Sequence, residues 1–191
     1  MLIAGCGSLL SRELEETRIP QSPETPLFAL AITAQEMARA YAEDGATFFS
    51  RDDPVNALAA YYYGFGWLHF GIAYGLLSRS GKPACPFDGQ HETLPLSQTA
   101  RLDEKVQRYA RLLDTACASV VPAPEPETAA GAFARKVIVI GTSYARGGRS
   151  SLAAGEREAA LARFSYGHGW VDAGARAGLL ALTGNREIFT V

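Results

Sequence analysis

The sequence has few of the residues from which disulfide frameworks and metal sites are built. Among its 191 residues are three cysteines and three histidines. Cys6, Cys85 and Cys117 are odd in number, lie far apart and show no CxxC spacing, and the histidines have no paired spacing. These absences disfavour a disulfide framework and a zinc site, and they favour a reducing compartment. We therefore predict a cytoplasmic protein with no metal and no cofactor.

A strong charge of either sign is also missing. Lysine and arginine together number 18, aspartate and glutamate number 20, and the net charge is -2. No run of like charges is present, whereas a nucleic-acid binder needs a basic face for phosphates. With 48% hydrophobic and 20% charged residues, the chain is globular and long enough to bury a core. The composition therefore argues against nucleic acid as a partner.

Glycine and aromatic residues, in contrast, are concentrated in one stretch that occurs twice. "YYYGFGWLHFGIAYGLL" (61–77) returns as "FSYGHGWVDAGARAGLL" (164–180), 103 residues later. The alignment extends without a gap back to Tyr41 and Tyr144, and it contains 14 identities in 37 positions. We interpret the chain as a tandem duplication, in which each copy helps to interpret the other.

The first copy, taken alone, looks like a membrane span. Val55–Leu77 is 23 residues without a charge, which is long enough to cross a bilayer. Two copies of one fold should share one environment, so we predict a buried core helix and no membrane contact. The equivalent stretch of the second copy carries charges that are costly in lipid, namely Glu158, Arg163, Asp172 and Arg176.

A second stretch, "KVIVIGTSYARGGRSS" (136–151), resembles a strand that leads into a phosphate-binding loop. A P-loop needs a glycine, four residues and then Gly-Lys-Ser/Thr. Here five residues separate Gly141 from Gly147, and no lysine follows. The aligned part of the first copy, "TAQEMARAYAED", is rich in helix formers. We predict a helix here and no nucleotide site.

Each copy has the pattern of three helices, and strand patterns are nearly absent. The predicted fold is all-α, with two three-helix repeats packed as an internal pseudo-dimer in a helical bundle. We expect the first repeat over 1–79, a proline-rich linker over 80–98 and the second repeat over 99–191. The expected helices cover about 9–17, 26–50 and 54–78, and then 101–120, 128–154 and 157–182.

Most glycines of the two third helices fall on one stripe of each helix, because successive residues turn by about 100°. A stripe of small residues lets another helix approach closely. We predict that the third helices pack on each other with Gly71 or Gly75 near Gly174 or Gly178. Gly71→Leu should then destabilise the protein more than Gly66→Leu, which lies off the stripe. The alternative is two separate bundles, each burying its stripe against its own second helix.

At these residues the chain also resembles a known family. The segment "AALARFSYGHGWVDAGARAGLL" (159–180) is similar to the third helix of short archaeal helical proteins, the domain of unknown function 357. The second copy follows the family pattern and departs from it at Gly167. The first copy has His69 for the aspartate of the pattern and Ala73 for its arginine. The resemblance implies an archaeal, cytoplasmic, all-helical protein and lends no established activity.

Candidate polar groups lie away from the glycine stripe. His168, Asp172 and Arg176 have i, i+4, i+8 spacing on one helix face. Asp172 can pair with Arg176 or orient His168 as a base, and we predict a partly exposed Asp172–Arg176 pair worth about 0–1 kcal/mol. No serine or cysteine is placed beside them as a nucleophile, so catalytic residues stay unassigned. The candidate ligand-binding residues are Tyr63, Trp67, His69, Tyr166, His168, Trp170, Asp172 and Arg176.

Two classes of function fit this sequence. The first is a protein-interaction or scaffold module for an unknown protein partner, since the second and third helices of each copy resemble the paired helices of tetratricopeptide-like modules. The alternative is a small-ligand-binding protein or an enzyme that uses the aromatic and His/Asp/Arg residues of the third helices. An enclosed cavity with converging polar groups would favour the alternative. We expect a monomer with internal pseudo-twofold symmetry or a homodimer.

Overall fold

The computed structural model describes residues 3–87 and 93–190, and within them the chain is mostly helical. The predicted linker includes residues 88–92, which lie outside the described residues. The first repeat consists of α1 (Ile3–Glu15), α2 (Pro26–Ser50) and α3 (Pro54–Ala73), and the second of α4 (Thr99–Ala118), α5 (Ala129–Ala153) and α6 (Arg157–Arg176).

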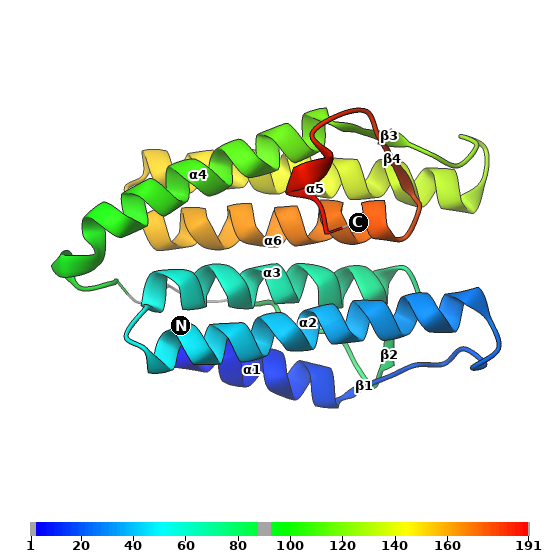
Figure 1. The fold of residues 1–191 in the computed structure, drawn as a ribbon, viewed down its shortest axis with the longest axis horizontal. Helices are drawn as coiled ribbons and strands as arrows, with labels where there is room; N and C mark the ends of the chain where they lie inside the picture. Colours follow the sequence, from blue (N-terminus) through cyan, green and yellow to red (C-terminus); the bar gives the residue numbers. More distant parts are fainter. Residues whose placement is uncertain (1–2, 88–92, 191) are drawn as a thin grey trace.

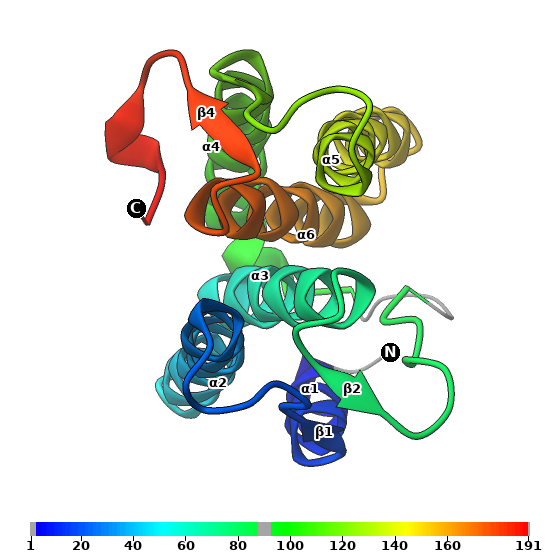
Figure 2. The ribbon, with the colours of Figure 1, turned by 90° about the vertical axis from the view of Figure 1, so that its right-hand side faces the viewer.

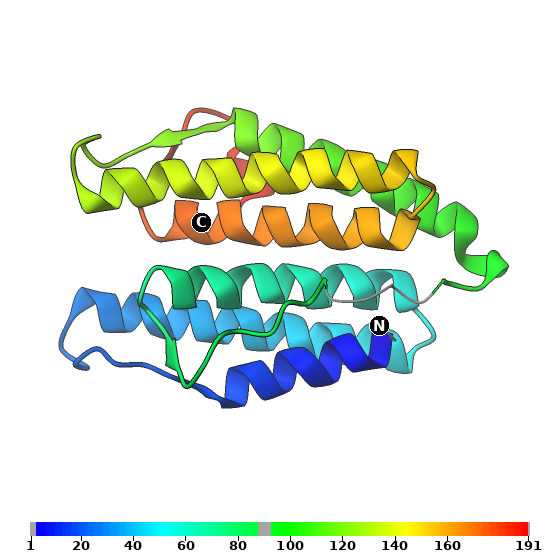
Figure 3. The same ribbon diagram turned by 180° about the vertical axis from the view of Figure 1, so that it is seen from behind.

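The two repeats pack as an internal pseudo-dimer, which confirms the predicted all-α fold class. Figure 1 shows α3 and α6 side by side in the middle of the molecule, with α1 and α2 on one side and α4 and α5 on the other. The end view in Figure 2 and the rear view in Figure 3 show the same layering. The third helices are buried along nearly their whole length because each faces both its own repeat and the other third helix.

Short strands close each repeat. β1 (Thr17–Arg18) pairs antiparallel with β2 (Ser78–Arg79), and β3 (Val120–Pro122) pairs with β4 (Leu180–Leu182). Each pair joins the end of the first helix to the segment that follows the third helix. Two single-turn 3-10 helices, η1 (Leu96–Gln98) and η2 (Arg186–Ile188), complete the described chain.

Side-chain caps explain where three of the long helices begin. The hydroxyl of Thr25 accepts from the Phe28 amide at 3.2 Å, and its equivalent Thr128 accepts from the Gly131 amide at 3.0 Å. The carboxylate of Asp53 accepts from the Asn56 amide at 3.1 Å, as the Asp-Pro sequence predicts. The valine-isoleucine run lies inside α5, so the prediction of a helix there is confirmed.

The third helices are shorter than predicted. They were expected to reach Ser78 and Leu182, but they end at Ala73 and Arg176. The physical reason is a left-handed turn at Gly75 (φ 78°) and Gly178 (φ 70°), a conformation that glycine adopts without steric cost. The Leu76 amide then bonds back to the Gly71 carbonyl at 2.8 Å, and the Leu179 amide to the Gly174 carbonyl at 3.0 Å.

The glycine stripe does not lie between the third helices, and the predicted contact of Gly71 or Gly75 with Gly174 or Gly178 is wrong. A Cβ atom at Gly71 would meet Leu77 of the returning chain, and one at Gly174 would meet Val137 and Leu180. The stripe therefore makes room within each repeat, as the alternative arrangement required.

The backbones of the two repeats meet instead at Gly66 and Gly169, two equivalent positions off the stripe. A Cβ at Gly66 would lie 2.5 Å from the Tyr166 carbonyl oxygen and 3.0 Å from the Gly169 Cα. A Cβ at Gly169 would lie 2.5 Å from the Tyr63 carbonyl oxygen. Only glycine fits this backbone-to-backbone contact, so the predicted ranking of Gly71→Leu above Gly66→Leu is reversed.

Within the described residues, no helix is long and apolar enough to cross a membrane.

Candidate functional site

The candidate site is the polar seam between α3 and α6, defined by Tyr63, His69, Tyr166 and Asp172. The Tyr63 hydroxyl donates to Asp172 Oδ2 across the interface. The Tyr166 hydroxyl lies 2.9 Å from His69 Nδ1, also across the interface. Positions 63 and 166 are equivalent in the duplication, as are 69 and 172. The same cross-repeat contact is therefore made twice, with a carboxylate as the partner in one case and an imidazole in the other.

Aromatic rings support both ends of this seam in the same way. The ring of Tyr41 lies 4.3 Å from that of Tyr63, and the ring of Tyr144 lies 4.5 Å from that of Tyr166. These distances join ring centroids, and the pairs are equivalent in the duplication. The Tyr144–Tyr166 pair has the spacing of a favourable aromatic pair, and the Tyr41–Tyr63 pair is slightly closer. The tyrosines of α2 and α5 thus hold the tyrosines of the seam in position.

The two tryptophans of the seam are buried as well. Trp67 is 1% exposed and Trp170 is 4% exposed. Trp170 packs edge-on against Phe70 of the other repeat, at a centroid distance of 5.8 Å. Their indole nitrogens make no well-formed hydrogen bond in the described structure. Their role in the seam is therefore chiefly apolar contact area.

Asp172 is fully buried, so the prediction of a partly exposed Asp172–Arg176 pair is wrong. Its Oδ1 accepts from the Thr190 amide at 2.9 Å, and its Oδ2 accepts from the Thr190 hydroxyl at 2.7 Å and from Tyr63. Among the described residues, Asp172 and Arg176 form no ion pair. The reason is a contact between residues distant in sequence. The chain after η2 brings Thr190 onto the face of α6 that carries Asp172.

The face formed by His168, Asp172 and Arg176, here called the strip, holds the segment Arg186–Thr190, here called the strap. His168 has a backbone hydrogen bond with Ile188. Arg176 Nη1 donates to the Thr190 carbonyl at 3.4 Å. The sequence correctly placed the three side chains on one helix face, and the structure shows that all three contact the strap.

The first repeat has an equivalent segment, Pro86 and Phe87, which correspond to residues 189 and 190. The Tyr62 hydroxyl donates to the Pro86 carbonyl at 2.5 Å. The Phe87 ring lies 5.3 Å from both the Tyr144 and Tyr166 rings. A segment that follows a third helix therefore lies near each seam tyrosine. Thr190 reaches Tyr63 through the shared carboxylate of Asp172, and Phe87 packs against Tyr166 with its ring.

Burial controls the protonation of the seam. Burial raises the pKa of Tyr63 well above its ordinary value, and the Asp172 carboxylate raises it further. Burial, with a smaller contribution from Arg79, lowers the pKa of His69 to about 4. Burial also lowers the pKa of His168, although the Asp172 charge opposes the shift. At neutral pH the imidazoles of His69 and His168 are therefore neutral, and the seam tyrosines are protonated.

This arrangement binds chain segments more readily than it suits acid–base chemistry. Both oxygens of Asp172 are engaged by Tyr63 and Thr190, so the expected orientation of His168 by Asp172 is not formed. His168 Nε2 and His69 Nε2 are buried without a partner among the described residues. Within residues 3–87 and 93–190, no group of three or more His, Cys, Asp or Glu side chains is placed to hold a metal ion.

The eight candidate residues therefore divide into two groups. All except Arg176 lie in or beside the buried interface of α3 and α6, and Arg176 is exposed at its edge. Sequence reasoning missed three contributors, namely Tyr41, Tyr144 and Thr190. The identity of Tyr41 and Tyr144 in the duplication was a usable signal, whereas nothing in the sequence marked Thr190.

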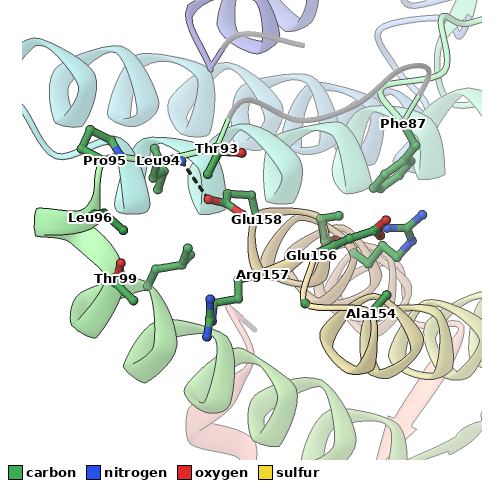
Figure 4. Close-up of a pocket in the computed structure, with 14 residues that line it drawn as sticks. Phe87, Thr93, Leu94, Pro95, Leu96, Thr99, Ala154, Glu156, Arg157 and Glu158 are labelled. Atoms are coloured by element: carbon green, nitrogen blue, oxygen red, sulfur yellow. Dashed lines mark hydrogen bonds between the residues drawn. The ribbon is translucent and has the colours of Figure 1, made fainter.

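A pocket of about 470 Å³ lies elsewhere, where the chain before α4 meets the first turn of α6. Figure 4 shows Glu158 pointing toward Leu94, and its Oε1 accepts a hydrogen bond from the Leu94 amide at 2.8 Å. Arg157 also lines the pocket and pairs with Asp103 at 2.6 Å. None of the eight candidate residues lines this pocket.

Fold and seam together define a class of protein, an all-helical duplication whose two repeats pair through their third helices. The comparison with protein families agrees with this class. A family described as protein of unknown function (DUF357) matches residues 7–77 and again residues 108–180. The chain belongs to the DUF357 family, as a tandem duplication of it. Searches of curated proteins and of solved structures found no match.

Proposed function

We propose that this protein is a protein-interaction module, whose binding face is the outer side of α5. The single observation that carries this proposal is the charge of that side. Between Ala129 and Ala153 the helix has no carboxylate, and it exposes the cations Arg135, Lys136, Arg146 and Arg149. One of them, Arg149, pairs with Asp114 of α4.

The equivalent helix of the first repeat has the opposite character. Among its exposed residues, α2 has three carboxylates and one cation, namely Glu36, Glu43, Asp44 and Arg39. The asymmetry extends to the whole repeats. Residues 1–79 contain five basic and nine acidic residues, a net charge of -4, whereas residues 99–191 contain twelve and nine, a net charge of +3. A basic face speeds association with a partner that carries an acidic face, and it disfavours basic partners.

An exposed apolar side chain lies within the basic face. Val139 of α5 is 60% exposed, and it lies one turn from Arg135 and Lys136. A face of cations around an apolar contact suits an acidic protein segment with an apolar residue. The partner class supported best is therefore an acidic segment of another protein.

A pair of charge-reversed variants tests the proposal. In the first, Arg135, Lys136 and Arg146 are each replaced by glutamate. In the control, three exposed arginines of the first repeat are replaced by glutamate, so that the total charge change is the same: Arg12, Arg39 and Arg51. Both variants and the native chain are used to co-purify partners from the source organism, followed by quantitative mass spectrometry.

We expect a defined set of acidic proteins that the native chain and the control retain and the α5 variant loses. Retention of the same proteins by all three chains would contradict the proposal. Recovery of nucleic acid in place of protein, lost with the α5 charges, would also overturn it.

Several predictions made from the sequence are more specific than this proposal and stay predictions. They are an archaeal source, a cytoplasmic location, a tetratricopeptide-like use of the helix pairs, and repeat boundaries at 79 and 99. The alternative function, binding of a small ligand by the third helices, also remains a prediction. Most of its candidate residues are buried, so that function requires part of the surrounding structure to move.

A further inference from the structure

We propose that the strip of His168, Asp172 and Arg176 is a binding groove for a short protein segment with an apolar residue followed by threonine or serine. The strap of the same chain is its intramolecular occupant. This groove uses residues other than the basic face of α5, and its partner is recognised through different chemistry.

The contacts between strip and strap define what the groove recognises. Asp172 accepts from both the amide and the hydroxyl of Thr190, at 2.9 and 2.7 Å. Arg176 donates to the Thr190 carbonyl, and His168 bonds to the backbone of Ile188. Most of these contacts address the main chain, and the one specific to a side chain requires a hydroxyl. Such contacts are available to any segment of this pattern that adopts the backbone conformation of the strap.

The strap itself is held by few apolar contacts. Phe189 is buried, whereas Arg186 and Glu187 are exposed and Ile188 is half-buried. The turn before the strap contains Asn185 in a left-handed conformation with φ 49°. A segment with one buried side chain and a single helical turn is held mainly by its polar contacts, and we expect it to open locally before the packed helices do.

The groove that a displaced strap leaves behind requires an occupant. Asp172 is 0% exposed, and without Thr190 its carboxylate would lose two of its three donors. His168 Nε2 is already buried without a partner among the described residues. A buried charge with missing donors is costly, so the strip favours binding of a segment that supplies an amide and a hydroxyl.

The first repeat has an equivalent segment, and its residues differ from those of the strap. Pro86 and Phe87 lie beside Tyr144 and Tyr166, where the strip partner is His69 and not aspartate. Where the third helix carries Asp172, the residue in the segment that follows is Thr190; where it carries His69, the equivalent residue is Phe87. The segment residue and the strip residue thus differ together between the two copies, as expected of a recognition site.

Because the strap is tethered, it competes at an effective concentration in the millimolar range. Binding in trans therefore becomes measurable when the strap is weakened. We use the full chain with Phe189→Ser and Thr190→Val, after circular dichroism has shown that it is folded. The probe is a fluorescently labelled peptide with the sequence of residues 183–190, Thr-Gly-Asn-Arg-Glu-Ile-Phe-Thr, and binding is followed by anisotropy.

We expect the strap-weakened chain to bind this peptide at least tenfold more tightly than the native chain does. A peptide with valine in place of its last threonine should bind about tenfold more weakly. Adding Arg176→Ala to the strap-weakened chain should reduce affinity about threefold, and since Arg176 is exposed this variant should fold. No gain over the native chain, or equal binding of both peptides, would overturn the proposal.

Hydrogen exchange on the native chain provides a test that needs no variant. We expect the amides of Ile188 to Thr190 to exchange at least a hundredfold faster than those in the middle of α6. Exchange of the strap at the same rate as α6 would mean that the groove opens only with global unfolding, and the proposal would then be wrong.

Discussion

The two ends of the seam make the same contact with different chemistry, and the comparison shows what the duplication preserved. At one end Tyr63 bonds to the carboxylate of Asp172, and at the other Tyr166 bonds to the imidazole of His69. The supporting tyrosine pairs have nearly equal ring distances, 4.3 and 4.5 Å. Geometry was therefore retained while the hydrogen-bond partner of the tyrosine diverged from a carboxylate to an imidazole.

The difference also explains why the segments that follow the third helices diverged. A buried carboxylate needs several donors, and Asp172 obtains two of them from Thr190. A neutral imidazole needs fewer, and the end with His69 is covered by the ring of Phe87 against Tyr166. The segment after α6 thus covers the seam through polar contacts, and the segment after α3 covers it through aromatic contacts.

The largest effect should come from the point that both ends share. Gly66→Leu forces a side chain against the Tyr166 carbonyl, at a site where a Cβ alone would approach to 2.5 Å. We expect a loss of about 3 kcal/mol or more in the free energy of unfolding. Gly71→Leu should cost less, because the neighbour of its Cβ is the mobile end of the Leu77 side chain at 2.9 Å. Denaturant unfolding measures both, and a larger loss for Gly71→Leu would contradict the assigned interface.

The second prediction compares the partners of the two seam tyrosines directly. Asp172→Ala leaves the Tyr63 hydroxyl and the donors of Thr190 without their acceptor, so we expect a loss of about 3 kcal/mol. His69→Ala removes the hydrogen bond between the imidazole and the Tyr166 hydroxyl and should cost about half as much. Thermal and denaturant unfolding of both variants test the ranking. If Asp172→Ala shifts stability by less than 1 kcal/mol, its carboxylate is exposed after all.

The third prediction uses pH to separate the ends. The pKa of His69 is lowered to about 4, from an ordinary value of 6.5. As pH falls from about 6.5 to 4, His69 binds a proton in the unfolded chain but stays neutral in the folded chain. His69 should therefore reduce the free energy of unfolding by about 2–3 kcal/mol over this window, with no contribution above it.

Comparison of the native chain with His69→Asn isolates this contribution from that of the carboxylates, which also titrate at low pH. The variant should lose stability less steeply between pH 6.5 and 4. Parallel pH profiles for the two chains would show that His69 is not buried at the seam.

The smallest effect is expected at the edge of the strip. Arg176 is exposed and donates to the Thr190 carbonyl at 3.4 Å. Arg176→Ala should reduce the free energy of unfolding by less than about 1 kcal/mol. It should still raise the hydrogen-exchange rate of the strap amides, because it removes a contact of the strap. Unchanged exchange at residues 188–190 would show that this hydrogen bond does not hold the strap.

Much of the fold could be predicted because the duplication repeats its own signals. Identical residues at Tyr63 and Tyr166, and at Trp67 and Trp170, set the register of the two third helices. Charges in the second copy predicted that the uncharged first copy is a core helix, and α3 is buried along nearly its whole length. Helix starts at threonine and at Asp53 follow from local capping, which the sequence records directly.

The remaining features depend on contacts that no local pattern contains. Gly75 and Gly178 looked like packing residues, yet their positive φ ends the helices and returns the chain. That return delivers Thr190 to Asp172, which is why a residue with the spacing of a surface pair is fully buried. Likewise, Gly66 and Gly169 meet because the helices cross there, and the crossing point depends on tertiary packing.

The central claim is that the seam joins the two repeats into one cooperative unit, and tryptophan fluorescence tests it most directly. Trp67 belongs to the first repeat and Trp170 to the second, and both are buried at the seam. Guanidinium unfolding of Trp67→Phe and Trp170→Phe is followed by fluorescence and by far-ultraviolet circular dichroism. We predict one transition in each variant, with the same midpoint for its single tryptophan and for its helix content. Separate midpoints for fluorescence and helix content within one variant would show that the repeats fold independently and contradict the account.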